Sequence, residues 1–293
     1  MAGQESAWLW QGSNALATEA DEFLIRFWGV RGSVATPEAS HLRYGGNTSC
    51  VEVRCGGRLL IFDAGTGLRG LGKALADNGI ADIDLFLSHT HIDHVAGLPF
   101  FRPMYEPGNT IRLWAGHLAP ERNLNEVLCR VMSSPLFPVP FGILGADITT
   151  NDFRLGETLS PAPGITLRTA GLNHPDRATG YRVEHAGKAV CYVTDTEHVV
   201  GARNSAIVEL VRDADIFIYD STYTDEEYPR FAGWGHSTWQ EGARLADAAR
   251  VKTLVVFHHD PDHDDDFMDR IQEEADRARP GTVVARESLI LRP

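Results

Sequence analysis

Short, continuous apolar runs recur along the chain and restrict its fold more than any other feature. In residues 84–90 (DLFLSHT) and 253–259 (TLVVFHH), the apolar side chains follow one another instead of alternating with polar ones. A strand of this kind indicates a sheet that is covered on both faces. The strands predicted from these and similar runs are 23–30, 49–55, 58–65, 84–90, 189–195, 214–220, 253–259 and 288–292.

Helices are predicted between and after these strands. They cover residues 67–78, 121–132, 201–212, 238–249 and 265–279. The fourth of these has the clearest start, because either Ser237 with Gln240 or Thr238 with Glu241 can form a capping box. Strands precede helices in each half of the chain. We therefore expect an α/β fold in which two halves stack sheet against sheet, a four-layer αββα sandwich.

The size of the chain suits a single large domain. With 293 residues, 43% of them hydrophobic, it can bury a sizeable core. We expect one domain over 23–293, an N-terminal extension over 1–22, and a proline-rich lid or insertion at about 100–150. No apolar stretch is long enough to span a membrane, no secretory signal is recognisable, and the four cysteines lack C-x-x-C spacing. These features predict a cytoplasmic protein with reduced thiols and no membrane contact.

Four of the predicted strands end in residues that can bind a metal ion, namely His89, Asp195, Asp220 and His258. In sheets flanked by helices, ligand sites collect at the carboxyl ends of the strands. The four side chains are therefore predicted to meet at one edge of the molecule, although they are far apart in sequence.

The densest group of such residues is the motif HTHIDH, which contains His89, His91, Asp93 and His94. In a turn between strand and helix, residues two apart can converge on one ion while the next pair faces a second. Neutral imidazole suits zinc, iron or manganese, and a carboxylate adds charge and a hard oxygen ligand. The motif therefore predicts a metal site, without a choice among these three metals.

The pattern H-x-H-x-D-H after an apolar strand resembles the metallo-β-lactamase superfamily, whose αββα fold agrees with the layout above. The stretch LNHPDRATGYRVE (172–184) is similar to the H-x5-G-Y-R stretch of its ribonuclease Z and phosphodiesterase branch. The loop GWGHST (233–238), preceded by YDSTY (219–223), resembles the H-S-T loop of the same branch. FWGVRGSVATP (27–37) and YGGNTSCVEV (44–53) are similar to the opening of bacterial metal-dependent phosphodiesterase-like hydrolases.

This resemblance implies two divalent metal ions per chain, zinc first, with manganese or iron as alternatives. The implied ligands are His89, His91 and His174 for one ion, Asp93, His94 and His258 for the other, and Asp195 as the bridge between them. His259, next in the chain, stays open as an alternative to His258. Asp63 is expected to orient a ligating histidine, and Asp220 either to do the same or to hold the Asp195 loop.

Catalytic roles follow from the same resemblance. His236 is expected to protonate the leaving oxygen, with Glu197 as a candidate partner, and Asp93 to steer the attacking water. Arg31 and Asn47 lie in glycine-rich turns at strand ends. They are candidates for contacting a substrate phosphate, with a plain turn role as the alternative.

Charge and composition bear on the substrate. The net charge of −13 disfavours extensive contact with the phosphate backbone of a nucleic acid. Residues 100–150 are rich in proline and apolar side chains, unlike the basic, flexible arm with which ribonuclease Z grips transfer RNA. We therefore expect a phosphodiesterase acting on a small phosphodiester such as a cyclic nucleotide. The alternatives are a ribonuclease Z-like endonuclease, a thioester or lactone hydrolase, and a non-catalytic metal and nucleotide sensor; a homodimer stays open.

Overall fold

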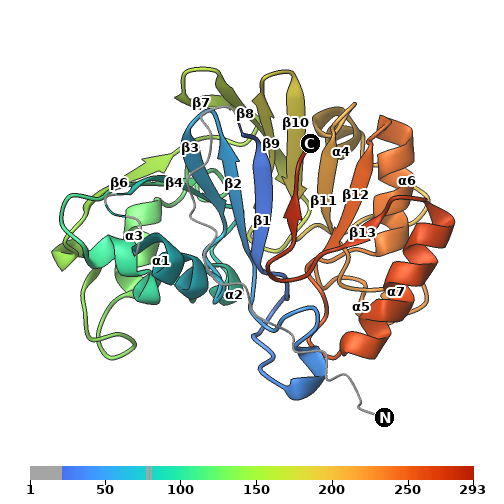
Figure 1. The fold of residues 1–293 in the computed structure, drawn as a ribbon, viewed down its shortest axis with the longest axis horizontal. Coiled ribbons are helices and arrows are strands. Elements are labelled where there is room, and N and C mark those ends of the chain that lie inside the picture. Colours follow the sequence, from blue (N-terminus) through green and yellow to red (C-terminus); the bar gives the residue numbers. More distant parts are fainter. Residues whose placement is uncertain (1–21, 77–78, 80) are drawn as a thin grey trace, which may run out of the picture.

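Two seven-stranded sheets form the centre of the computed structural model, which describes residues 22–76, 79 and 81–293 (Figure 1). All but Glu22 of the predicted N-terminal extension lies outside the described residues. The first sheet has the order β14-β1-β2-β3-β4-β5-β6. Its strands are β14 (Ile290–Leu291), β1 (Leu24–Gly29), β2 (Cys50–Cys55), β3 (Arg58–Phe62), β4 (Asp82–Leu87), β5 (Thr110–Ala115) and β6 (Asp147–Asp152). Pairing is antiparallel from β14 to β3 and parallel from β3 to β6.

The second sheet has the order β13-β12-β11-β10-β9-β8-β7. Its strands are β13 (Val283–Val284), β12 (Thr253–Phe257), β11 (Ile216–Asp220), β10 (Lys188–Val193), β9 (Ala178–His185), β8 (Ile165–Leu172) and β7 (Thr158–Ala162). Strands β10 to β13 run parallel, so their carboxyl ends lie at one edge. The antiparallel β7, β8 and β9 complete the sheet on the other side.

Helices cover the outer face of each sheet, as expected for four αββα layers (Figure 1). On the first sheet lie α1 (Leu68–Ala76), α2 (Ile92–Val95) and α3 (Leu124–Val131). On the second lie α4 (Ser205–Leu210), α6 (Trp239–Ala249) and α7 (Asp265–Ala278), with the short α5 (Tyr228–Phe231) beside them. Short 3-10 segments occupy 39–41, 98–100, 102–105 and 141–143. Among the described residues, no helix is both long and apolar enough to cross a bilayer.

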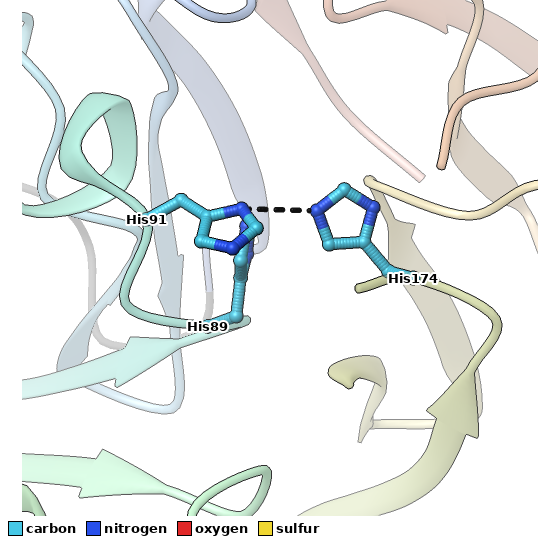
Figure 2. A group of neighbouring side chains, drawn as sticks. All are labelled: His89, His91 and His174. Atoms are coloured by element: carbon cyan, nitrogen blue, oxygen red, sulfur yellow. Dashed lines mark hydrogen bonds between the residues drawn. The ribbon is translucent and has the colours of Figure 1, made fainter. Parts of the chain in front are cut away.

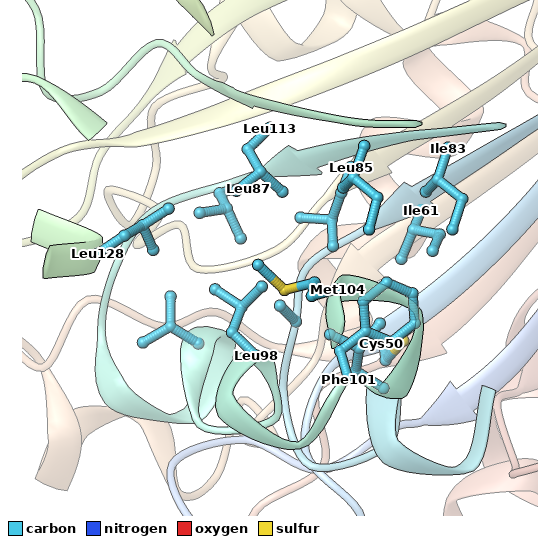
Figure 3. Close-up of a cluster of buried hydrophobic side chains, with 14 of the residues drawn as sticks. Cys50, Ile61, Ile83, Leu85, Leu87, Leu98, Phe101, Met104, Leu113 and Leu128 are labelled. Atoms are coloured by element: carbon cyan, nitrogen blue, oxygen red, sulfur yellow. The ribbon is translucent and has the colours of Figure 1, made fainter. Parts of the chain in front are cut away.

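The continuous apolar runs are explained by the layers on both sides of each sheet. In β4, Leu85 and Leu87 pack outward into the cluster beneath α1 and α3, whereas Phe86 points inward to the core between the sheets (Figure 3). In β12, Leu254 packs beneath the outer helices and Val255 faces the other sheet. All but the first residue of each of these two strands is thus buried, and alternation disappears from its sequence.

The five predicted helices are present as α1, α3, α4, α6 and α7, of which α4 has six residues against the twelve predicted. At the start of α6, the Thr238 side chain accepts a hydrogen bond from the Glu241 backbone N–H, which selects the second of the two capping alternatives. Ser237 instead bonds the side chains of Tyr219 and His198. All four cysteines are unpaired.

The segment predicted as a lid or insertion, about 100–150, contains two strands of the first sheet. Residues 110–115 and 147–152 form β5 and β6, which extend the first sheet by parallel pairing. The connection between them, which contains α3, and residues 100–109 before β5 lie outside the sheet. Strand β5 (TIRLWA) alternates buried and half-buried residues, so it lacks the continuous apolar run by which the other strands are predicted. The same reason explains why β8, with its alternating burial, was missed.

Candidate metal centre

The carboxyl ends of β4, β10, β11 and β12 bring the predicted site residues together between the sheets. His89 follows β4 by two residues and Asp195 follows β10 by two. Asp220 ends β11, and His258 comes directly after β12. Donor atoms of His89, His94 and Asp195 all lie within 4.8 Å of one another, so residues distant in sequence form one cluster.

One group of three donors consists of His89, His91 and His174, the set predicted for the first ion (Figure 2). His89 and His91 come from the loop between β4 and α2, and His174 comes from the loop after β8. Figure 2 shows the rings of His91 and His174 facing each other, with His91 Nδ1 and His174 Nε2 separated by 3.1 Å. Because the Gly235 carbonyl accepts from His174 Nδ1 at 2.8 Å, the lone pair of that ring lies on Nε2, toward the group.

A second group consists of Asp93, His94 and His258, the set predicted for the other ion. Nε2 of His94 and Nε2 of His258 lie 3.2 and 3.6 Å from Oδ2 of Asp93. Asp195 lies between the groups. Its Oδ2 is 3.2 Å from His94 Nε2 and 3.3 Å from His258 Nε2.

The other oxygen of Asp195 faces the first group. Oδ1 is 3.8 Å from His89 Nε2 and 3.7 Å from His174 Nε2. One carboxylate oxygen therefore points toward each set of histidines, which is the arrangement that a bridging ligand requires.

The donor set fits divalent metal ions. The Nε2 atoms of His89, His94 and His258 are buried and have no hydrogen-bond partner within residues 22–76, 79 and 81–293. Buried polar atoms without partners are costly and rare, and here all three point at a shared carboxylate. Burial, reinforced by the neighbouring His94, lowers the pKa of His89 well below its usual value. His89 is thus in the neutral form that binds metals.

Asp63 holds one of these histidines in place. It follows β3, and its Oδ2 lies 2.8 Å from His94 Nδ1, so His94 donates there and keeps Nε2 for the cluster. The same carboxylate accepts from the Ser88 N–H and hydroxyl and from the Tyr192 hydroxyl. This position matches the orienting role predicted for Asp63.

Asp220 holds both the Asp195 loop and a histidine. Its carboxylate accepts from the N–H of Thr196, next to Asp195, at 3.1 Å, and also bonds Thr222. It further lies 3.0 Å from Nδ1 of His236. The histidine that it orients is therefore His236, and not one of the seven predicted ligands.

His236 lies at the edge of the cluster. Its Nδ1 is 3.8 Å from Oδ1 of Asp195, and its ring stacks on that of His258 with 5.0 Å between centroids. Burial alone lowers the pKa of His236, but the Asp220 carboxylate outweighs it and raises the pKa to about 9. His236 is close enough to the other donors to ligate, and Asp220 holds its Nδ1, the ring nitrogen that lies 3.8 Å from Asp195.

Glu197 holds the loop that carries His236 by hydrogen bonds to its backbone. The predicted partnership with the His236 ring is not formed among the described residues. The carboxylate accepts from the N–H groups of Gly233 and Gly235 at 2.9 and 2.8 Å. A side chain at Gly235 would place its Cβ 2.5 Å from His174 Nδ1, so the loop can approach that ring only with glycine there. In the sequence, the signal for this role was a G-x-G loop, whose free backbone N–H groups need an acceptor such as an acidic side chain.

Arg31 and Asn47 have structural roles that differ from the predicted phosphate contacts. Arg31 is fully buried, and its guanidinium donates to the carbonyls of Gly45, Asp260 and His263. Asn47 is occupied at both ends, since its amide donates to Glu287 and its Oδ1 accepts from a threonine hydroxyl. The glycine-rich turns suggested that the side chains of Arg31 and Asn47 would be exposed. Both instead form hydrogen bonds that hold separate segments of the chain together.

His258, and not His259, belongs to the cluster. The His259 ring is buried, and its Nε2 bonds the carbonyl of Ala285 at 2.8 Å, away from the metal centre. The His258 ring lies against the backbone of Gly32, where an added Cβ would come within 2.4 Å of it. His258 and Asp195 have positive φ angles of 64° and 54°, backbone conformations that are uncommon and often occur at functional sites.

Comparisons with known proteins agree with the fold. A family model described as the Beta-lactamase superfamily domain matches residues 58–259, more than half of the chain. Ribonuclease Z of Gemmatimonas aurantiaca is 26% identical over 90% of this chain and 94% of its own length. Among solved structures, the metallo-beta-lactamase fold protein YhfI of Bacillus subtilis superposes with a TM-score of 0.68 at 18% identity, over 93% of this chain and 100% of its own. A diphosphatase from the PhnP family gives 0.67 at 21% identity, over 93% and 98%.

Proposed function

Because the chain belongs to the β-lactamase superfamily domain family and is a metal-dependent hydrolase of that fold, we propose that it is a phosphodiesterase for small phosphodiesters such as cyclic nucleotides. The residues that would hold two divalent ions are the two groups described above, joined by Asp195. When bound, such ions would polarise a phosphoryl oxygen and favour deprotonation of water at neutral pH.

The Asp220–His236 pair beside the cluster is the observation that carries this proposal. In phosphodiester hydrolysis a water oxygen bonds to phosphorus, the ester P–O bond breaks, and the departing alkoxide needs a proton. An imidazole held by a buried carboxylate is suited to donate that proton. A thioester releases a stable thiolate that needs no such donor, so the pair favours phosphodiesters.

Asp93 is proposed to orient the attacking water and to accept its proton. Its Oδ2 accepts from the Ser33 N–H at 2.8 Å and faces His94 and His258. The carboxylate is therefore fixed on the second group of donors. His236 stands at the border of both groups, so a phosphate between them would have a proton acceptor and a proton donor within the same site.

The size of the proposed substrate follows from charge and shape. The chain carries 40 acidic and 27 basic residues, which opposes binding of a long polyanion. A cavity of about 420 Å³ lies beside His89 and His91, within the usual range for small-molecule sites. Residues 116–146, between β5 and β6, contain two arginines and no lysine, fewer basic side chains than a basic RNA-gripping arm needs.

The test is hydrolysis by protein loaded with zinc or manganese. Bis(p-nitrophenyl) phosphate, a panel of cyclic nucleotides and dinucleotides, and a precursor transfer RNA are compared by kcat/KM, with metal content measured in the same samples. We expect turnover of the small diesters and little cleavage of the RNA. A metal-loaded protein that hydrolyses none of these phosphodiesters, but binds nucleotide tightly, would instead be a sensor.

A ribonuclease Z-like endonuclease is the second candidate, because the curated relative described above carries that name and aligns with most of the chain. Site-specific cleavage of the precursor transfer RNA, at a kcat/KM far above that of every small diester, would favour it.

A further inference from the structure

One of the five predicted ligand histidines differs from the others in how its ring is held. In four of them, Nδ1 lies within hydrogen-bond distance of a group outside the two donor groups. These pairs are His89 with Ser88, His94 with Asp63, His174 with Gly235 and His258 with Thr222, at 2.8 to 3.1 Å. The ring of His91 has no such partner among the described residues, because its one hydrogen bond there is to His174, another predicted ligand (Figure 2). Since metal-binding histidines depend on such partners for their orientation, the position of His91 must be set through its backbone.

The backbone next to His91 is held by a single side chain. Thr90 stands between His89 and His91, in the loop between β4 and α2. Within the part of the chain that the structure describes, Thr90 forms one hydrogen bond, in which its hydroxyl lies 3.1 Å from Nε2 of His117. This bond therefore ties the loop that carries two predicted ligands to the segment after β5.

His117 is a well-fixed partner for this bond. It follows β5 by two residues, as His89 follows β4, and the last residues of these strands, Leu87 and Ala115, are paired. His117 is only 2% exposed, and its ring centroid lies 6.4 Å from that of His89. Burial lowers the pKa of His117 to about 3, so the ring is neutral and has one N–H. Because Nδ1 has no hydrogen-bond partner among the described residues, a proton on Nε2, donated to the Thr90 hydroxyl, is the arrangement that leaves no ring N–H unpaired.

We propose that His117 is a positioning residue for the metal ion of the first histidine group, and that it acts on His91 through Thr90. Without the His117–Thr90 hydrogen bond, the loop can shift and the ring of His91 can turn away from the other two donors. The second group does not depend on this bond, because its two histidines, His94 and His258, each have a partner of their own. The proposal goes beyond the proposed function, since it concerns metal binding and holds whichever ester is cleaved.

The test measures the affinity for each of two zinc ions by competition with a chromophoric chelator. We expect His117→Ala to weaken one ion by about tenfold or more, the usual effect of removing a group that orients a ligand, and to leave the other within about twofold. Thr90→Val removes the same hydrogen bond from its other side and should have the same effect. Because both changes act on one contact, the double variant should bind zinc no more weakly than either single variant.

Matched variants separate positioning from packing. Glutamine can place an N–H where Nε2 of His117 lies, whereas asparagine is one bond shorter, so His117→Gln should recover most of the affinity and His117→Asn should not. Thr90→Ser keeps the hydroxyl, and His185→Ala lies at the end of β9, which runs antiparallel to β10; both should bind zinc like the wild type. In a protein that already carries His91→Ala, adding His117→Ala should have no further effect, because the ligand through which it acts is gone.

Three results would overturn the proposal: unchanged zinc affinity in His117→Ala and Thr90→Val, an equal loss at both ions, or an effect of His117→Ala that persists without His91. Urea unfolding of the metal-free proteins is measured alongside. If His117→Ala does not fold, Thr90→Val, on the half-buried side of the bond, decides the matter by the same criteria. If no protein hydrolyses bis(p-nitrophenyl) phosphate but the loss is confined to one ion, the phosphodiesterase proposal fails and the positioning role stands.

Discussion

The two halves of the molecule contribute to the metal centre in different ways. The first half supplies four donors from one stretch of six residues, His89 to His94, which spans the loop after β4 and the start of α2. The second half supplies His174, Asp195, His236 and His258 from four separate loops. A loop places its donors by local geometry, whereas the second set depends on the pairing and register of β8 to β12. The donors of the first half can therefore be predicted from a motif, whereas those of the second half come together only when the second sheet folds.

Replacing Asp195, which lies between the two groups of donors, should have the largest effect on activity. Asp195 faces both groups, with one oxygen toward each. We expect Asp195→Ala to lower kcat/KM by at least about 10⁴-fold, because several kcal/mol of charge stabilisation correspond to several factors of ten. Elemental analysis should show loss of bound metal. Asp262→Ala, in an exposed loop, is the control; a variant at Asp195 that keeps full metal content would contradict the bridging role.

Removing a second-half residue that is not a predicted ligand should separate catalysis from metal binding. His236→Ala is expected to reduce turnover of bis(p-nitrophenyl) phosphate by roughly 10²- to 10³-fold, the usual contribution of a proton donor. Metal content should stay near two per chain, as it should in the surface control His185→Ala. Loss of metal from His236→Ala would show that the His236 ring is itself a metal ligand. The second half would then contribute only ligands and no separate proton donor.

A smaller effect is expected from the side chain that fixes the His236 loop. Glu197 bonds two backbone N–H groups of that loop, and glutamine offers only one acceptor oxygen. We expect Glu197→Gln to lower kcat by about tenfold with little change in metal content, as found for groups that orient a site indirectly. Aspartate should not restore activity, because it is too short to reach both N–H groups. An unchanged kcat would mean that the loop holds its shape without this carboxylate.

The smallest effect is expected for Asp215, at the end of the second sheet opposite the metal centre, and it concerns stability and not activity. Asp215 precedes β11 and accepts from Lys252 Nζ at 2.6 Å and from the Ala189 N–H at 2.8 Å. Burial alone raises the pKa of Asp215, but these two donors outweigh it, so the pKa lies below its usual value. The ionised form therefore stabilises the fold above the unfolded pKa of about 3.9, and this stabilisation is lost as pH falls further.

For Asp215→Asn we accordingly expect the free energy of unfolding to fall by about 1–2 kcal/mol at pH 7, with activity unchanged. The difference from wild type should shrink below about pH 4. Urea denaturation at several pH values measures it. A difference that stays constant from pH 7 to pH 3 would show that the charge of Asp215 does not contribute.

The sequence predicted the parts of the fold in which burial is continuous. Apolar runs gave β4, β10, β11 and β12, and with them the edge where the donors meet. Alternating strands such as β5 and β8 were missed, since each leaves every second residue less buried. The prolines between 100 and 150 predict a lid or insertion there, and the alternating pattern of β5 does not show that this segment also contains strands of the first sheet.

For the site, residue type and motif located the donors, but partners could not be read from sequence. Arg31 looked like a phosphate contact because the turn around it is rich in glycine, yet it donates to three carbonyls inside the fold. The pairing of Asp220 with His236 depends on the end of β11 and a loop before α6, which meet only in the folded chain. His117 lies on a segment with no motif, so only the folded chain places it beside Thr90.

Two glycines restrict the orientations, and so the conformational entropy, of two histidine rings at the metal centre. Gly32, in the first half, lies against the ring of His258 in the second, and Gly235 lies against the ring of His174. Backbone that approaches this closely leaves each ring few orientations. The conformational freedom of these side chains is therefore lost when the chain folds, and not when an ion binds, so that binding has less disorder to overcome.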